Sequence, residues 1–180
     1  MVIQKNSMRQ VIAIIGTSHL YQFGGAALTA MQNDAFAELL RQSCHTHAIS
    51  CLAEEMSHDA LKAQDRTSST VEELSHTLGL DHIYCDPSDA EQEALGLRIE
   101  RNKTGFKHFR GWTDKELDKA IAAEHRIREG LWLEKLKDRA LWPYLFVCGS
   151  QHAIHFWTLV RDEGFEAVIV SENWDALTSP

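Results

Sequence analysis

Residues 11–19 read VIAIIGTSH, in which five apolar residues lead into a Gly-x-x-His motif. Residues 144–152 read YLFVCGSQH and repeat this arrangement. Neither apolar run alternates with polar residues, which is typical of a strand buried on both faces of a parallel sheet. The sequence therefore predicts two equivalent strands, each followed by a turn that carries a histidine.

Three further apolar runs have the same character, at His47–Ala53, His82–Cys85 and Ala167–Val170. Segments with helical spacing separate the five runs, at residues 25–43, 56–64, 69–78, 114–139 and 153–163. Alternating strands and helices predict an α/β fold with a mostly parallel central sheet of about five strands and helices on both faces. The length of 180 residues fits a single domain over residues 1–180.

The composition excludes several classes of protein. Hydrophobic residues make up 44% and charged residues 24%, so a disordered or fibrous protein is not expected. No stretch approaches the roughly 20 apolar residues of a membrane helix, and the N-terminus lacks a signal-peptide core. We therefore expect a cytoplasmic protein without membrane contact, with its four dispersed cysteines reduced. Assembly into a homo-oligomer is compatible with the sequence.

The charge is unevenly distributed. The net charge is -8, but residues 98–110 hold five basic residues and one acidic residue, which leaves -12 on the rest of the chain. The protein as a whole is therefore not expected to bind nucleic acid, and only this basic segment could do so. The longer segment 96–112 is predicted to be either a basic lid over the functional site or a mobile loop, because long connections commonly take one of these roles.

Ligands of parallel sheets bind outside the carboxyl ends of the strands. Five side chains that follow the predicted strands are suited to catalysis or metal binding: His19, Glu54, Glu55, Asp86 and His152. Two neutral imidazoles and one carboxylate can hold a divalent metal with open positions for water. The pattern predicts such a metal site at His19, His152 and Glu55. The alternative is that each histidine only caps its helix or packs against its turn.

Glu54 and Glu55 are adjacent, so in an extended chain their side chains point to opposite faces. Only one can face the crevice, and the sequence does not decide which. Either could also act only as a favourable charge at a helix N-terminus. Asp86 precedes Pro87, so it is a candidate cofactor ligand or a plain turn residue.

Three other residues are candidates for cofactor binding. Gly16 and Gly149 open the two motifs, and glycine lets the backbone bend sharply and approach a ligand. His155 follows His152 by three residues and so shares its helix face, either as a ligand or as a partner of a ligand.

Arg128 is an unusual residue in the predicted helix 114–139. At 100° per residue it falls in the middle of the apolar face that Leu117, Ile121 and Trp132 define. A buried guanidinium is costly unless it is paired. Arg128 therefore either forms a structural ion pair with Glu124, one turn earlier, or reaches the site. There it would bind an anionic or polarised oxygen or orient the catalytic Glu.

The order of these motifs resembles the TraB/TIKI/erythromycin esterase/ChaN-like superfamily. The resemblance rests on the two Gly-x-x-His motifs, the Glu after the second strand, GLDHIYCDP at residues 79–87 and EHRIREGLWLEKL at residues 124–136. It implies metal-dependent peptide cleavage as in TIKI-like members, lactone opening as in erythromycin esterases, or haem binding as in ChaN-like members. By resemblance His19 and His152 match the motif histidines, Glu55 matches the motif Glu better than Glu54, and Arg128 matches the helix Arg.

The motif AEEMS at residues 53–57 differs from the Glu-x-Asp of TraB and TIKI members. This difference favours a small ester, amide or nucleotide-like substrate over a peptide. We therefore expect a hydrolase of an ester, amide or peptide bond. His19, His152 and Glu55, with Glu54 second to Glu55, would hold a metal or polarise water directly, and Arg128 would stabilise the oxyanion. The alternatives are a non-catalytic module that binds haem, metal or an anion, and a toxin or defence component that acts on nucleotides.

Overall fold

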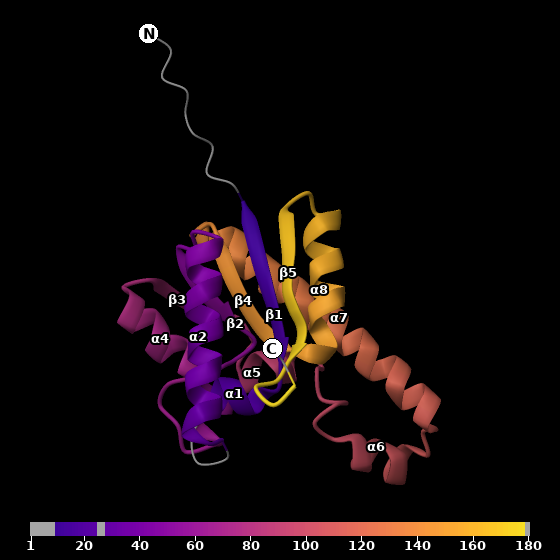
Figure 1. Cartoon of the computed structure of the whole chain (residues 1–180). Helices are drawn as coiled ribbons and strands as arrows, with labels where there is room; N and C mark the ends of the chain where they lie inside the picture. Colours follow the sequence, from indigo (N-terminus) through magenta and orange to yellow (C-terminus); the bar gives the residue numbers. More distant parts are fainter. Residues whose placement is uncertain (1–9, 25–27, 179–180) are drawn as a thin grey trace.

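The computed structural model describes residues 10–24 and 28–178 and contains a five-stranded sheet (Figure 1). The strands are β1 (Val11–Thr17), β2 (Cys51–Glu54), β3 (Asp81–Tyr84), β4 (Tyr144–Gly149) and β5 (Glu166–Trp174). Their spatial order is β3-β2-β4-β1-β5, and each neighbouring pair is parallel. The predicted α/β fold with a parallel five-stranded sheet is confirmed.

Eight helices connect the strands within the described residues. They are α1 (His19–Phe23), α2 (Ala30–Thr46), α3 (His58–Lys62), α4 (Thr70–Leu78), α5 (Asp89–Ala94), α6 (Lys103–Arg110), α7 (Asp114–Arg139) and α8 (Ser150–Asp162). The five predicted helices correspond to α2, α3, α4, α7 and α8. Residues 25–27 of the first predicted helix lie outside the described residues. The second strand begins at Cys51 rather than His47, because α2 continues to Thr46.

Capping residues explain where α2, α4 and α7 begin. Thr29, Ser69 and Thr113 each precede a helix and accept a hydrogen bond from a backbone N–H of its first turn. In α2 and α7 the third helical residue, Gln32 or Glu116, bonds back to the capping residue and completes a capping box. These signals are local, which is why helix positions could be read from the sequence.

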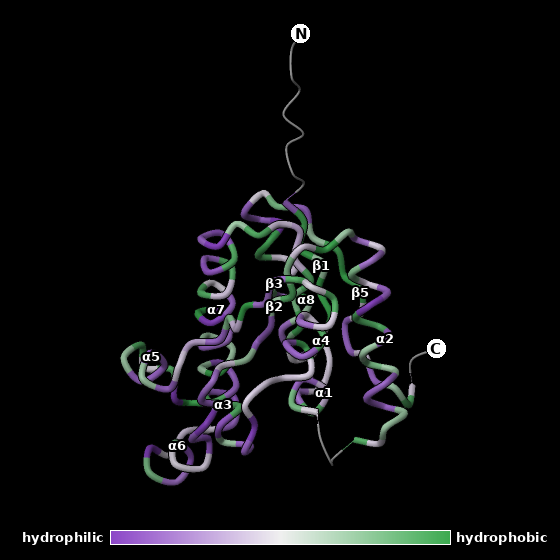
Figure 2. The backbone as a smooth tube through the Cα atoms, turned by 90° about the vertical axis from the view of Figure 1, so that its left-hand side faces the viewer, coloured by the Kyte–Doolittle hydropathy of each residue, from purple (hydrophilic) through white to green (hydrophobic). Residues whose placement is uncertain are grey.

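Both faces of the sheet are covered, since successive residues of a strand point to opposite sides. Ile12 and Ile14 of β1 pack with the buried residues of α7 and α8, whereas Ala13 and Ile15 pack with those of α2 and α4. Figure 2 shows the apolar strands enclosed by helices with hydrophilic outer turns. The prediction of helices on both faces is therefore confirmed. No helix of the described part of the chain is long and apolar enough to cross a membrane.

The segment 96–112, predicted as a basic lid or a mobile loop, contains a helix of its own. Its role as a lid stays a prediction. Residues 103–110 form α6, which ends at Gly111 with a left-handed φ of 65°. Phe106 packs against Trp112 with ring centroids 5.0 Å apart, and this contact holds the helix end to the next segment. α6 and the start of α7 project away from the sheet (Figure 1).

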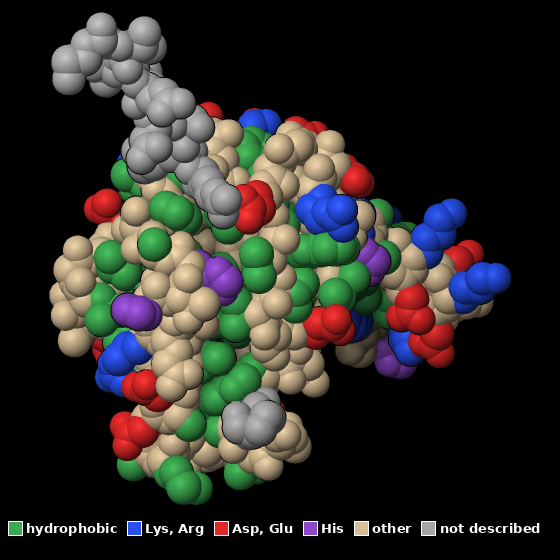
Figure 3. All heavy atoms as spheres, turned by 45° about the horizontal axis from the view of Figure 1, so that its top comes forward, with side chains coloured by type: hydrophobic (Ala, Val, Ile, Leu, Met, Phe, Trp, Pro, Cys, Tyr) green, Lys and Arg blue, Asp and Glu red, His purple; other side chains and the backbone are tan. Residues whose placement is uncertain are grey.

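The basic side chains of this segment are paired with acids that lie mostly outside it. The pairs are Arg98 with Glu93, Arg101 with Asp89, Lys103 with Glu100, and Lys107 with Asp114. Arg110 lies over the ring of Phe106. Basic and acidic side chains accordingly stand side by side on this projection (Figure 3). The local excess of positive charge is thus largely compensated in three dimensions, which weakens the case for nucleic-acid contact.

Candidate functional site

Three neighbouring strands bring Glu55, His19 and His152 to one end of the sheet. β2, β4 and β1 are adjacent and parallel, so the residues that follow them meet at one rim. Glu55 Oε1 lies 3.7 Å from His19 Nε2 and 3.4 Å from His152 Nε2. The structure therefore brings together three residues that are up to 133 positions apart in the sequence.

The two motif histidines occupy different environments. Thr17 pairs with Gly149 in the sheet, so the motifs are offset by one residue. His19 is the first residue of α1, and its side chain is 40% exposed. His152 is the third residue of α8 and is fully buried, with its Nδ1 2.8 Å from Glu129 Oε1. Only His19 is open to a substrate.

The two adjacent glutamates point to different surroundings, as an extended chain requires. Glu55 Oε2 accepts a hydrogen bond from the Gly149 backbone N–H at 2.8 Å, which fixes the carboxylate in the crevice. Glu54 is also fully buried, but it accepts a hydrogen bond from Ser69 Oγ and lies 2.9 Å from His82 Nε2. Glu55 is therefore the glutamate that faces the site.

Arg128 reaches the site from α7. Its Nη2 donates to Glu55 Oε1 at 2.6 Å, and its Nε donates to Asp86 Oδ1 at 2.9 Å. Burial raises the pKa of Asp86, and the charge of Arg128 offsets only part of this effect. The alternative pairing with Glu124 is wrong, because the Glu124 carboxylate instead accepts the backbone N–H groups of Ile99 and Glu100 at 2.8 and 2.9 Å.

The electrostatics of the buried groups fix their charges at neutral pH. Burial acts to raise the pKa of Glu55, but the hydrogen bond from His152 and the charge of Arg128 outweigh it and lower that pKa to about 2. Burial acts to lower the pKa of His152, but hydrogen bonds to Glu129 and Glu55 raise it to about 9. Glu55 is therefore a carboxylate and His152 an imidazolium at neutral pH.

Two cavities meet at His19. One has a volume of about 290 Å³ and is lined by residues that include Glu55, Arg128 and Gln151. The other has a volume of about 450 Å³ and is lined by the start of α8 and by Asn173. His19, Phe23 and Gln151 line both cavities. A ligand in either cavity would contact the exposed histidine.

The candidate glycines have different roles. A Cβ on Gly16 would lie 2.1 Å from the Glu172 carbonyl oxygen, so glycine is needed there to pack β1 against β5. A Cβ on Gly149 would lie 3.0 Å from His19 Nε2 and 3.3 Å from Glu55 Oε2. Glycine at 149 therefore keeps the crevice open.

His155 is exposed on α8 and lines neither of the two cavities. His155 was expected to share a helix face with His152, but its side chain does not reach the crevice. Asp86, in contrast, lines the smaller cavity and bonds Arg128. Of the proposed cofactor ligands, Asp86 and Gly149 lie at the site.

Several residues that hold the site were not predicted from the sequence. Gln22 Oε1 lies 2.9 Å from His19 Nδ1, and the spacing of three residues on one helical turn is a signal that could have identified it. Glu129 follows Arg128 directly, but nothing in the sequence links it to His152. Glu100, which lies 3.7 Å from Arg128 NH1, gave no signal either.

The donor set does not favour a divalent metal. Among the residues that the structure describes, no three His, Cys, Asp or Glu side chains form a group arranged to hold a metal ion. Glu55 Oε1 is bonded by Arg128, and Glu55 Oε2 is bonded by the Gly149 N–H. A cation would have to displace the guanidinium or lie against it. The predicted ligands therefore do not fit a metal in this arrangement.

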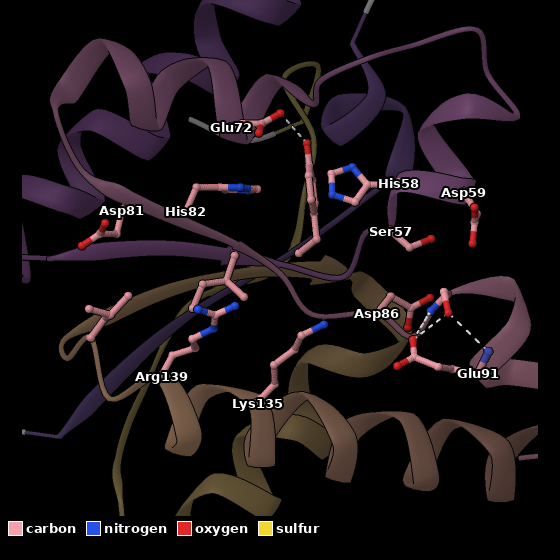
Figure 4. A pocket seen from close by; sticks show the side chains of 14 residues that line it. Ser57, His58, Asp59, Glu72, Asp81, His82, Asp86, Glu91, Lys135 and Arg139 are labelled. Atoms are coloured by element: carbon pink, nitrogen blue, oxygen red, sulfur yellow. Dashed lines mark hydrogen bonds between the residues drawn. The ribbon is translucent and has the colours of Figure 1, made fainter.

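A larger cavity of about 600 Å³ lies at the β3 edge of the sheet (Figure 4). Lys135 and Arg139 extend into it from α7, opposite His82, and Tyr84 also lines it. Two of its polar groups are committed to structural partners: His82 to Glu54, and the Tyr84 hydroxyl to Glu72 at 2.5 Å. The crevice at His19 combines an accessible histidine with buried charges, which makes it the stronger candidate site.

No protein-family model, curated protein or solved structure matches this chain. The superfamily expectation accordingly rests on the motif residues alone.

Proposed function

We propose that the protein is a hydrolase of a small ester or amide in which His19 acts as the general base. The observation that carries this proposal is the position of His19 between two cavities, with Nδ1 held by Gln22 and Nε2 3.7 Å from the buried Glu55 carboxylate. A histidine that is accessible on one side and oriented on the other is the usual arrangement of a catalytic base.

The proposed reaction begins with a water molecule beside His19. Nε2 removes a proton as the water oxygen bonds to the substrate carbonyl carbon, and the carbonyl electron pair moves to oxygen. The ionised Glu55, 3.7 Å away, stabilises the imidazolium that forms. When the tetrahedral intermediate collapses, the bond to the leaving group breaks and the imidazolium returns the proton to it.

Positive charge for the developing oxyanion is available at the start of α8. Ser150 and Gln151 line the same cavity as His19, and the first turn of a helix presents backbone N–H groups and the positive end of its dipole. Arg128 is already bonded to Glu55 and Asp86, so its main role is to hold Glu55 in place. This assigns Arg128 a positioning role rather than direct contact with the oxyanion.

Glu55 and His152 support the reaction without a metal ion. Glu55 stays ionised because its pKa is about 2. The protonated His152, 3.4 Å from Glu55, adds a fixed positive charge next to this carboxylate. Cavities of about 290 and 450 Å³ suit a small molecule better than a folded polypeptide. We propose that this reaction takes place in the cytoplasm.

A substrate panel tests the proposal. The wild-type protein, His19→Ala and the matched control His155→Ala would be assayed on activated esters, lactones, amides and peptides, with and without a chelator. We expect hydrolysis of at least one ester or amide, a loss of about 100-fold or more in His19→Ala, and no change in His155→Ala or with the chelator. Stoichiometric binding of haem without any turnover would instead support the non-catalytic module.

A further inference from the structure

Gln22 is a buried polar residue behind the exposed histidine. Its side chain has 0% exposure, and it lies one helical turn after His19 on α1. A buried amide needs partners for both its nitrogen and its oxygen, because an unsatisfied group costs roughly 1–3 kcal/mol. The partners that the fold supplies therefore decide which way the amide points.

Three oxygen acceptors surround the amide nitrogen of Gln22. Nε2 lies 3.1 Å from Glu54 Oε2. The same nitrogen lies 3.5 Å from the Glu55 carbonyl oxygen and 3.4 Å from the Val147 carbonyl oxygen. Turning the amide over would place its oxygen against a carboxylate and two carbonyls, none of which donates a hydrogen bond. The oxygen of Gln22 is therefore directed at His19 Nδ1, 2.9 Å away.

An oxygen accepts, so His19 Nδ1 must donate. In a neutral imidazole one nitrogen carries the proton and the other carries the lone pair. We infer that Gln22 is a positioning residue that holds neutral His19 as the Nδ1–H tautomer and thereby directs the lone pair of Nε2 into the crevice. A fixed orientation of this kind is what a general base requires.

Glu54 acts through Gln22. Its carboxylate is fully buried, is bonded by Ser69 Oγ, lies 2.9 Å from His82 Nε2 and accepts the Gln22 amide. The network therefore has two ends, His82 at the β3 edge and His19 at the crevice. The adjacent glutamates thus act on one histidine from two sides, since Glu55 faces Nε2 and Glu54 controls Nδ1 through Gln22.

The effect of Gln22 on catalysis rests on the proposed function. The tautomer of His19, in contrast, can be measured whether or not the protein hydrolyses a substrate. Heteronuclear NMR of the histidine ring nitrogens measures it directly in the full-length protein, and His19→Asn identifies the His19 signals. We expect Nδ1 of neutral His19 to be protonated and Nε2 to be unprotonated. Gln22→Met keeps the side-chain length but removes the acceptor, so the Nδ1–H pattern should be lost. In this variant kcat should fall about 100-fold or more with little change in KM.

One further variant serves as a control. Gln42→Met lies on the exposed side of α2 and should change neither the spectrum nor kcat. An Nε2–H tautomer in the wild-type protein would overturn the inference, even if Gln22→Met failed to fold. An unchanged Nδ1–H pattern in folded Gln22→Met would also overturn it. If His19 shows the expected tautomer but no substrate of the panel is hydrolysed, the inference about Gln22 holds and the proposed hydrolase function is wrong.

Discussion

Glu55 Oε1 lies 2.6 Å from the NH2 group of Arg128, and this single oxygen also faces both motif histidines. The carboxylate has only 2% side-chain exposure. Three positively charged or potentially charged groups thus converge on one buried acid. The ion pair is the structural centre of the crevice, since it ties α7 to the carboxyl ends of the strands.

Removing Arg128 should strongly destabilise the protein. Arg128→Met keeps most of the side-chain volume but leaves Glu55 and Asp86 buried without their cation. Breaking a buried pair in this way costs about 3–5 kcal/mol. Urea denaturation would measure the free energy of unfolding, with Arg41→Met as control, because Arg41 pairs with Glu38 on the surface and such pairs contribute about 0–1 kcal/mol. Equal effects of the two substitutions would contradict the structural role of Arg128.

A methyl group on residue 149 should impair activity without unfolding the protein. The backbone φ of Gly149 is -59°, which alanine adopts readily, but its Cβ would lie 3.0 Å from His19 Nε2. We expect Gly149→Ala to reduce kcat by about tenfold or more, because small displacements of a positioned base are costly. The control is Gly130→Ala, whose Cβ would meet nothing within 4 Å. It should stabilise α7 by about 0.5–1 kcal/mol. Equal kcat values in the two variants would show that residue 149 is not part of the site.

The stability of the fold should decrease at alkaline pH because of His152. Its pKa is raised from 6.5 to about 9 in the folded protein, so its stabilising contribution is complete below pH 6.5 and is lost as the pH rises to about 9. The size of this loss is on the order of 3 kcal/mol. Glu55 acts in the opposite direction, since its contribution is lost as the pH falls from 4.5 to about 2.

Denaturation of the wild-type protein and of His152→Gln between pH 6.5 and pH 9 would measure this effect. The variant should lose the decrease in stability over this interval, whereas His155→Gln should keep it, because His155 is exposed. A wild-type stability that does not change over this interval would contradict the charged His152–Glu129 pair.

The fold and part of the crevice were predictable from the sequence. Apolar runs and caps are local signals, and the shared rim of a parallel sheet explains why His19, His152 and Glu55 could be expected to meet. The offset of one residue between β1 and β4 could not be predicted, since it depends on strand register. His152 is buried and His19 is exposed, although their motifs follow neighbouring strands.

Contacts between side chains of distant elements could not be predicted from the sequence either. Arg128 was expected to pair either with Glu124 or with the site, and only packing of α7 against the strand ends decided between them. The structure of α6 was missed because its amphipathic segment is short and rich in basic residues, which is typical of a loop as well.

Chemical rescue of His19→Ala is the sharpest test of His19 as the general base. The side chain of His19 is accessible at the junction of two cavities, so free imidazole can reach the vacated position. If His19 is the general base, the variant should hydrolyse the best panel substrate about 100-fold or more slowly than the wild-type protein. Added imidazole should then restore the rate in a saturable manner. A His19→Ala variant that keeps the wild-type rate, or whose lost activity does not respond to imidazole, would contradict the account.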